Sequence, residues 1–194
     1  LQAQHITPSA TKNTEQLSYA IGEIITKSHT PGVAVAMIAA DGKIWQHTAG
    51  FSNLLDKTPV TSGTQFRLGS ISKMLVSWSV MKLVEQGKLN LNDKLAQLAP
   101  EIEFNNPWER QYPVRVVHLL EHTTGWDAPH FVESSYNEPK PLSTLDGLAL
   151  HPHSRQSRWA PGSRTAYNNT GPTVAAYIVE KLSGMTFEDF VHQN

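Results

Sequence analysis

The sequence contains no cysteine, and other features that mark special classes of protein are missing as well. Without cysteine there are no disulfide bonds and no cysteine-ligated metal sites, in whichever redox compartment the protein works. Sixteen basic side chains stand against seventeen acidic ones, giving a net charge of -1 without any cluster of Lys or Arg. Nucleic-acid binding depends on such positive charge, so we expect no nucleic-acid partner. No apolar run approaches the ~18 residues that span a bilayer, so we expect no transmembrane segment.

What is present is an ordinary globular composition, with 39% hydrophobic and 17% charged residues in a chain of 194. The chain starts with Leu1 rather than Met, and residues 1–12 are polar. Such a start is typical of a chain left by signal-peptide cleavage or by trimming. We therefore expect a periplasmic or secreted protein whose signal has been removed, while a cytoplasmic location is also compatible with the composition.

The N-terminal quarter predicts a helix followed by a β-hairpin. Apolar residues repeat at helical spacing from Thr14, a plausible N-cap, to about Lys27. The runs Val33–Ala40 and Lys43–Gly50 are rich in strand-forming residues, and Asp41-Gly42 lies between them. Asp-Gly between two such runs is a strong hairpin signal.

The remainder reads as helices separated by long connections. A second helix follows Ser70 and ends at Gly87, and shorter ones are expected over about Val116–His122 and after Ser143. A long helix ends at Gly184, and a new one begins at Thr186 shortly before the last residue. We expect the second helix to bury one apolar face: Ile71, Met74, Leu75, Trp78, Met81 and Val84.

Two short motifs carry possible chemistry. In Ser70-Ile71-Ser72-Lys73 the serine opens an apolar helix and the lysine follows one turn later, whereas the same spacing in Ser9–Lys12 lies in the polar leader. A neutral amine beside a serine hydroxyl suits nucleophilic catalysis without histidine. Tyr167-Asn168-Asn169, the only Tyr-x-Asn of the chain, could supply a proton shuttle and an amide anchor. The alternatives are a solvated Ser and Lys, and an ordinary loop with a packed Tyr.

Three segments together resemble the landmarks of class C β-lactamases, D,D-peptidases and related esterases. They are FRLGSISK at 66–73, HLLEHTTG at 118–125 and WAPGSRTAYNN at 159–169, and the resemblance runs roughly from Thr14 to the end. It implies that Ser70 is the acylated nucleophile and Lys73 its proton acceptor. It also implies that Tyr167 is a second acid/base group and that Asn169 contacts substrate and lysine.

The resemblance implies a β-lactamase/transpeptidase-like α/β fold with a helical subdomain, of which this is the N-terminal part. Residues 1–87 would form the first part of the α/β subdomain, residues 88–165 the helical subdomain, and residues 166–194 the return to the α/β subdomain. The family's third motif, Lys or His two places before a Gly on a later strand, is missing at all twelve glycines. We therefore expect the C-terminal strands and helix to be absent, and a further segment or a second chain to complete the sheet.

The implied function is that of a serine hydrolase that attacks an amide or ester carbonyl through an acyl-enzyme, without a cofactor. The substrate is a small molecule or a peptide, and a β-lactam, a D-Ala-D-Ala peptide and an ester all remain open. The chain alone would be poorly active or inactive. The alternative is a non-catalytic or slowly acylating protein that binds peptidoglycan or β-lactams.

Two further patterns compete with this interpretation. His118-Leu119-Leu120-Glu121-His122 has the His-x-x-Glu-His spacing of a zinc site on one helix face, but it falls within a segment that matches the serine hydrolases. We therefore expect no metal site. Asn168-Asn169-Thr170 fits a glycosylation acceptor, a common triplet that we set aside because a glycan would block the expected cleft.

Overall fold

The computed structural model describes residues 13–127 and 141–194. Its contacts divide the chain into two compact units, Leu1–Arg67 and Leu68–Asn194, each of which is described here by itself. This division falls at a different place from the boundaries after residues 87 and 165 expected from the sequence. The three-part organisation therefore stays a prediction.

The first unit opens with helix α1, Thr14–Lys27. The side chain of Asn13 accepts a hydrogen bond from the Gln16 N–H at 2.9 Å, which makes Asn13 the N-cap. The expectation of Thr14 as the cap is therefore wrong by one residue. Both residue types can cap a helix, so the pattern of residue types does not decide between neighbouring positions.

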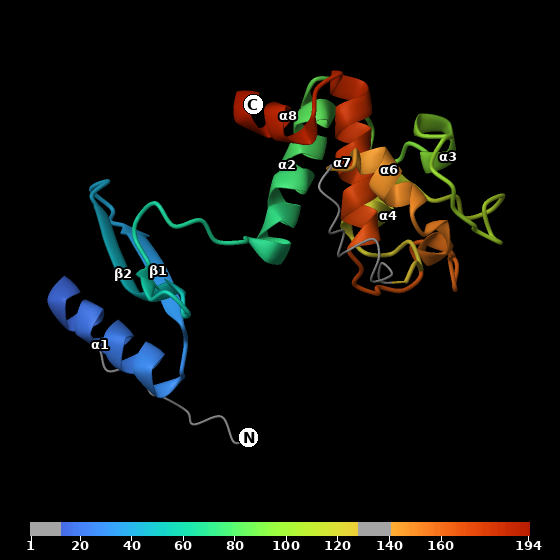
Figure 1. Cartoon of the computed structure of the whole chain (residues 1–194). Coiled ribbons are helices and arrows are strands. Elements are labelled where there is room, and N and C mark those ends of the chain that lie inside the picture. The colour runs from blue at the N-terminus through green and yellow to red at the C-terminus, as the bar shows by residue number, and fades with distance from the viewer. Residues whose placement is uncertain (1–12, 128–140) are drawn as a thin grey trace. The chain divides into compact units, whose positions relative to one another are not determined.

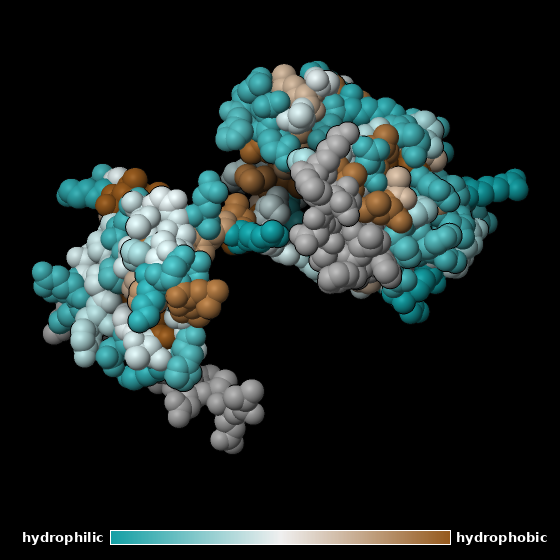
Figure 2. All heavy atoms as spheres, viewed as in Figure 1, coloured by the Kyte–Doolittle hydropathy of each residue, from teal (hydrophilic) through white to brown (hydrophobic). Residues whose placement is uncertain are grey.

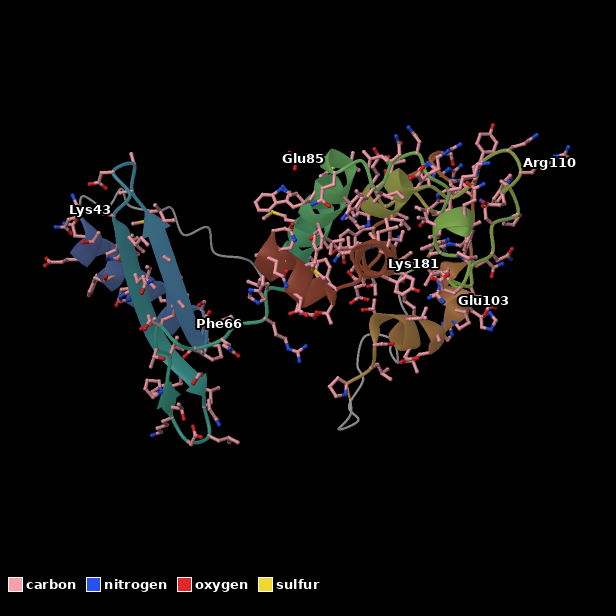
Figure 3. All side chains as sticks on the ribbon, turned by 90° about the horizontal axis from the view of Figure 1, so that it is seen from above. Lys43, Phe66, Glu85, Glu103, Arg110 and Lys181 are labelled. Atoms are coloured by element: carbon pink, nitrogen blue, oxygen red, sulfur yellow. The ribbon has the colours of Figure 1, made fainter. Side chains whose placement is uncertain are left out.

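The expected hairpin is confirmed, with strands β1 (Gly32–Ile38) and β2 (Ile44–Asn53) paired antiparallel (Figure 1). At its tip the Asp41 carboxylate accepts from the Lys43 N–H at 3.1 Å and pairs with the Lys43 ammonium at 2.6 Å. Figure 3 shows Lys43 at this end of the hairpin. Gly42 has a φ of 81°, which explains a glycine at this turn. A short strand β3, Thr58–Pro59, extends the sheet in the order β1-β2-β3.

This three-stranded sheet buries little of its own apolar surface. Among the described residues of the first unit only Val60 is buried. Ile38 and Ile44 are register partners at the tip of the hairpin, and they remain 74% and 63% exposed. The strand β1 has a neighbour on one side only, so this edge is left apolar and unpaired within the unit.

The second unit is built around two long helices, α2 (Ser72–Glu85) and α7 (Thr170–Ser183). They lie side by side and run in the same direction, so both begin at the same end of the unit (Figure 1). The shorter elements of the unit are the α-helices α3 (Leu95–Leu98), α4 (Val116–Leu120), α6 (Thr144–Ala149) and α8 (Phe187–Gln193), with a 3₁₀ turn at Pro152–Arg155.

The core of this unit lies where α2, α4 and α7 meet. Its fully buried side chains include Val80, Leu83, Leu119, Val174 and Ile178, each 0–1% exposed. Burying an aliphatic side chain of this size contributes roughly 1.5–3 kcal/mol. The two helix starts that carry the candidate residues are therefore fixed by a common core.

The expected buried face of α2 is wrong, because several of the residues assigned to it are exposed. Met74, Trp78 and Met81 are 54%, 68% and 46% exposed, while the helix buries Val76, Ser79, Val80 and Leu83 instead. Apolar residues occur on several sides of this helix, with polar ones between them, so a three-and-four repeat can be drawn on more than one face. Hydrophobic residues also lie visibly on the surface, among largely hydrophilic ones (Figure 2).

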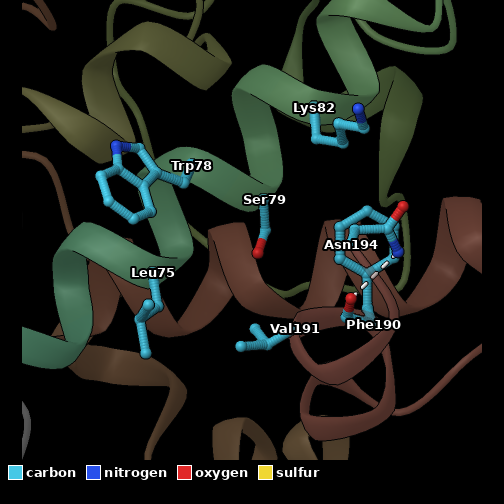
Figure 4. A pocket seen from close by; sticks show the side chains of 7 residues that line it. All are labelled: Leu75, Trp78, Ser79, Lys82, Phe190, Val191 and Asn194. Carbon is cyan, nitrogen blue, oxygen red and sulfur yellow. Dashed lines mark hydrogen bonds between the residues drawn. The ribbon is translucent and has the colours of Figure 1, made fainter. Parts of the chain in front are cut away.

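Part of this α2 surface borders a pocket of about 360 Å³ against α8. Trp78 and Leu75 approach it from α2, while Phe190 and Val191 approach it from α8 (Figure 4). The pocket is lined mainly by apolar side chains and lies apart from the motifs singled out in the sequence.

Helix ends follow the local signals closely. Gly87 and Gly184 have φ values of 68° and 72° beyond the ends of α2 and α7. The Thr186 hydroxyl accepts from the Asp189 N–H at 3.1 Å and caps α8, as the sequence indicates. The exception is α4, which ends at Leu120 and not at His122, because His122 adopts a φ of 58° that a helix does not allow.

In the described part of the chain no helix has the length and hydrophobicity needed to cross a membrane.

Candidate active site

Ser70 lies in a 3₁₀ turn, Gly69–Ile71, that leads directly into α2. Gly69 has a φ of 55°, and the Ser72 hydroxyl closes the turn by donating to the Gly69 carbonyl at 2.7 Å. The side chain of Ser70 is exposed. The turn therefore presents the serine oxygen to solvent at the positive end of the helix.

Lys73 lies one turn into α2 and links Ser70 to a distant part of the chain. Its ammonium donates to the Ser70 Oγ at 3.1 Å and to the Asn169 Oδ1 at 2.7 Å. Lys73 is half-buried. The helical spacing of Ser-x-x-Lys gives the first contact, whereas the second depends on the packing of α2 against α7.

Tyr167 completes the group from the loop before α7. Its phenol oxygen lies 2.6 Å from the Ser70 Oγ, and the Lys73 Nζ lies 4.9 Å from the centre of its ring. The Lys73 ammonium and then the Ser70 hydroxyl lower the pKa of Tyr167, because both stabilise the phenolate. The tyrosine is 57% exposed, so the group is open to solvent.

The structure thus brings together all four residues singled out in the sequence: Ser70, Lys73, Tyr167 and Asn169. The serine hydroxyl lies within hydrogen-bond distance of two side chains that can take up a proton when they are deprotonated, Lys73 as the neutral amine and Tyr167 as the phenolate. This arrangement can activate a hydroxyl as a nucleophile and later return its proton to a leaving group.

Asn168, the middle residue of Tyr-x-Asn, has a role that the sequence analysis missed. It is 1% exposed, its Oδ1 accepts from the Gly171 N–H at 2.8 Å, and its amide donates to the Ala166 carbonyl at 3.2 Å. A Cβ on Gly171 would come within 2.8 Å of the Leu119 carbonyl, so glycine allows α4 to approach here. Asn168 therefore fixes the turn from which Tyr167 and Asn169 project. The signal that was overlooked is an Asn three residues before a glycine at a helix start.

His122 is the second residue that was missed, having been considered only as a zinc ligand. Its ring lies against that of Tyr167, with centroids 4.6 Å apart. Burial, and then the charge of Lys73, lower the pKa of His122, because both disfavour a second cation.

His118 has different partners, which separates the two imidazoles of the His-x-x-Glu-His pattern. Its Nδ1 accepts from the Arg115 N–H at 3.2 Å, and a Cβ on Gly162 would lie 3.2 Å from its Nε2. Since α4 ends at Leu120, the two histidines do not share a helix face as a zinc pair would require. In residues 13–127 and 141–194 no group of three or more His, Asp or Glu could hold a metal ion.

The chain is similar to known proteins over most of its length. The sequence matches the Beta-lactamase family over residues 17–194. It is 30% identical over 170 residues to a "Beta-lactamase" of Yersinia enterocolitica, covering 88% of this chain and 41% of that protein. It is 28% identical over 159 residues to "Penicillin-binding protein 4*" of Bacillus subtilis, covering 80% of this chain and 34% of that one. The chain therefore spans less than half the length of these relatives.

Among solved structures, the octameric penicillin-binding protein homologue from Pyrococcus abyssi superposes with a TM-score of 0.76 at 27% identity. The match covers 93% of this chain and 42% of that one. The expected β-lactamase/transpeptidase-like α/β fold is confirmed by this likeness for the part that the chain covers. With the family match over residues 17–194 beside it, the chain belongs to the Beta-lactamase family.

Proposed function

We propose that this protein is a serine hydrolase that cleaves an amide or ester carbonyl through an acyl-enzyme on Ser70. The observation that carries the proposal is the contact of the Ser70 Oγ with both the Lys73 Nζ at 3.1 Å and the Tyr167 OH at 2.6 Å. The relatives named as a β-lactamase and a penicillin-binding protein support the same class of reaction. The substrate is a small molecule or peptide such as a β-lactam, a D-Ala-D-Ala peptide or an ester.

In the proposed first step the Ser70 oxygen attacks the carbonyl carbon while its proton passes to the Lys73 side chain in its neutral amine form or to Tyr167 in its phenolate form. The carbon–nitrogen or carbon–oxygen bond of the substrate then breaks, and the same proton returns to the leaving group. In the second step water attacks the ester on Ser70 and restores the hydroxyl. Each step uses only side chains of this site and water, and needs no cofactor.

Asn169 has a positioning and substrate-contacting role in this proposal. Its Oδ1 holds the Lys73 ammonium at 2.7 Å, so the amine is kept beside Ser70 and not released to solvent. The other end of the amide is a hydrogen-bond donor that can meet a substrate carbonyl. Since the residue is exposed, substrate can reach it directly.

Covalent labelling tests the assignment of Ser70. The longest natural polypeptide that contains this sequence is treated with a β-lactam or a fluorophosphonate and mapped by mass spectrometry. We expect the adduct on Ser70, and its loss in Ser70→Ala, because Ser70 is the serine, among those in residues 13–127 and 141–194, with both the Lys73 amine and the Tyr167 phenol at its oxygen.

Ser77→Ala is the matched control for this experiment, because Ser77 lies on the same helix but outside the turn that presents Ser70. Ser72 is unsuitable, because its hydroxyl closes that turn through the Gly69 carbonyl. We expect the control to label like the wild type. An adduct on another residue, or equal labelling of Ser70→Ala, would refute the assignment. Labelling without turnover of a chromogenic β-lactam or ester would select the alternative, a slowly acylating peptidoglycan- or β-lactam-binding protein.

We also propose that a further polypeptide, either a segment of the same protein or a second chain, completes the sheet of the first unit. The exposed Ile38 and Ile44 and the unpaired edge of β1 support this, as does the greater length of the relatives.

The expected location of the protein is the periplasm or the cell exterior.

Residues 1–194 alone should therefore associate in solution, since an unpaired apolar edge invites pairing. We expect analytical ultracentrifugation to show species larger than a monomer that become fewer in the double variant Ile38→Lys, Ile44→Lys. The Lys pair adds charge at the exposed tip without touching buried residues. A compact monomer that unfolds cooperatively and hydrolyses a chromogenic ester at full rate would contradict the proposal.

A further inference from the structure

His122 occupies an unusual backbone position beside the candidate site. It follows the end of α4 at Leu120 and adopts a φ of 58°, in the left-handed region that few residues other than glycine enter. It is half-buried, and Thr123 and Thr124 after it are buried. Such a conformation is kept only where the surroundings hold it, and it is often found at functional sites.

His122 contacts three successive residues of the loop that carries Tyr167. Its carbonyl accepts from the Ala166 N–H at 2.8 Å, and its Nδ1 accepts from the Asn168 N–H at 3.4 Å, a long and therefore weak bond. Between these two bonds its ring packs on the ring of Tyr167, at 4.6 Å and 41°. One residue thus holds the backbone on both sides of the tyrosine as well as the phenol itself.

The contacts of His122 matter because the side chain of Tyr167 is otherwise largely exposed to solvent. The tyrosine is 57% exposed, and its position relative to Ser70 decides whether the phenol can exchange a proton with the serine. An error of about 1 Å in the placement of a catalytic group can cost about 10² in rate.

We propose that His122 is the positioning residue for Tyr167, holding the phenol at the Ser70 oxygen through its ring and holding the adjoining backbone through its carbonyl and Nδ1. The inference rests on the proposed function only for its kinetic consequence, since the placement of the phenol can be measured independently. An Nδ1 that accepts a hydrogen bond carries no proton. The lowered pKa of His122, caused by burial and by the charge of Lys73, favours the same neutral form.

The variant His122→Asn separates positioning from folding. Asparagine enters the left-handed region readily and keeps an acceptor near the place of Nδ1, but it lacks the ring. We expect a thermal unfolding midpoint close to that of the wild type. The rate of Ser70 acylation at saturating probe should fall about 10–100-fold, the range seen when a supporting residue around a reactive group is lost. The probe concentration at half-saturation should change little.

A spectroscopic titration of Tyr167 measures the placement of the phenol without depending on activity. The phenolate absorbance of Tyr167 is obtained by subtracting the titration of Tyr167→Phe in the wild-type and His122→Asn backgrounds. We expect the midpoint to move upward towards 10 in His122→Asn, because a misplaced phenol loses the stabilisation by Lys73 and Ser70 that lowers its pKa.

His118→Asn is the matched control, since His118 belongs to the same segment but its Nδ1 serves the Arg115 N–H. It should leave the Tyr167 midpoint and the acylation rate unchanged. A folded His122→Asn protein with an unshifted Tyr167 midpoint would overturn the positioning role. If the wild type is not acylated at all, the proposed function fails, and the titration still decides the role of His122.

Discussion

Replacement of Lys73 by alanine should slow acylation of Ser70 by about 10²–10⁴, the usual cost of removing a positioned acid/base group. The amine of Lys73 donates to the Ser70 Oγ at 3.1 Å and is the group nearest to the serine on the same helix. Its removal also leaves the Asn169 Oδ1 without the ammonium that it contacts. The measurement is the rate of adduct formation with a fluorophosphonate or β-lactam, followed by mass spectrometry.

Lys82→Ala provides the comparison on the same helix. Lys82 pairs with Glu85 at 3.0 Å, with its side chain 42% exposed, and it has no contact with Ser70. An exposed pair of this kind contributes at most ~1 kcal/mol to stability, so the variant should fold and react nearly as the wild type does. Similar acylation rates for Lys73→Ala and Lys82→Ala would show that Lys73 is not the base.

Tyr167→Phe should also reduce acylation by about 10²–10⁴, because it removes only the phenol oxygen that lies 2.6 Å from the Ser70 Oγ. The ring remains, so its packing on His122 and the surrounding loop should persist. The control is Tyr112→Phe, a tyrosine of similar exposure, 52% against 57%, on a segment outside the site. Unchanged acylation in a folded Tyr167→Phe protein would remove Tyr167 from the mechanism.

The pH dependence should identify the form in which Tyr167 acts. If the phenolate accepts the serine proton, the rate rises with pH through the pKa of Tyr167, which Lys73 and Ser70 hold below its usual value of 10.0. Removing the Lys73 ammonium then raises that pKa, so the rising limb of the residual activity should move to higher pH. A limb that stays in place in Lys73→Ala would mean that another group controls it.

The short-range features of this protein followed from the sequence because each depends on neighbouring residues. The Asp41-Gly42 turn predicted the hairpin, and Gly87, Gly184 and Thr186 predicted where helices end or begin. The Ser-x-x-Lys spacing at the start of a helix predicted that Lys73 would lie beside Ser70, since three residues make nearly one helical turn. Tyr167 and Asn169 were singled out as the only Tyr-x-Asn of the chain and by the family resemblance, but no local pattern predicts that they lie beside Ser70.

The assembly of the candidate site and the choice of buried residues depend on contacts between distant parts of the chain, so only the tertiary structure decided them. Ser70 and Tyr167 are 97 positions apart, and they come together only because α2 and α7 share a core and begin at the same end of their unit. Packing also determined that Val80 and Leu83 are buried while Trp78 and Met81 are exposed, in a helix α2 that carries apolar residues on several sides. His122 packs against Tyr167 because helix α4 ends at Leu120, before His122. Local sequence fixes periodicity and chain reversals, whereas the burial of one face rather than another is settled by partners far along the chain.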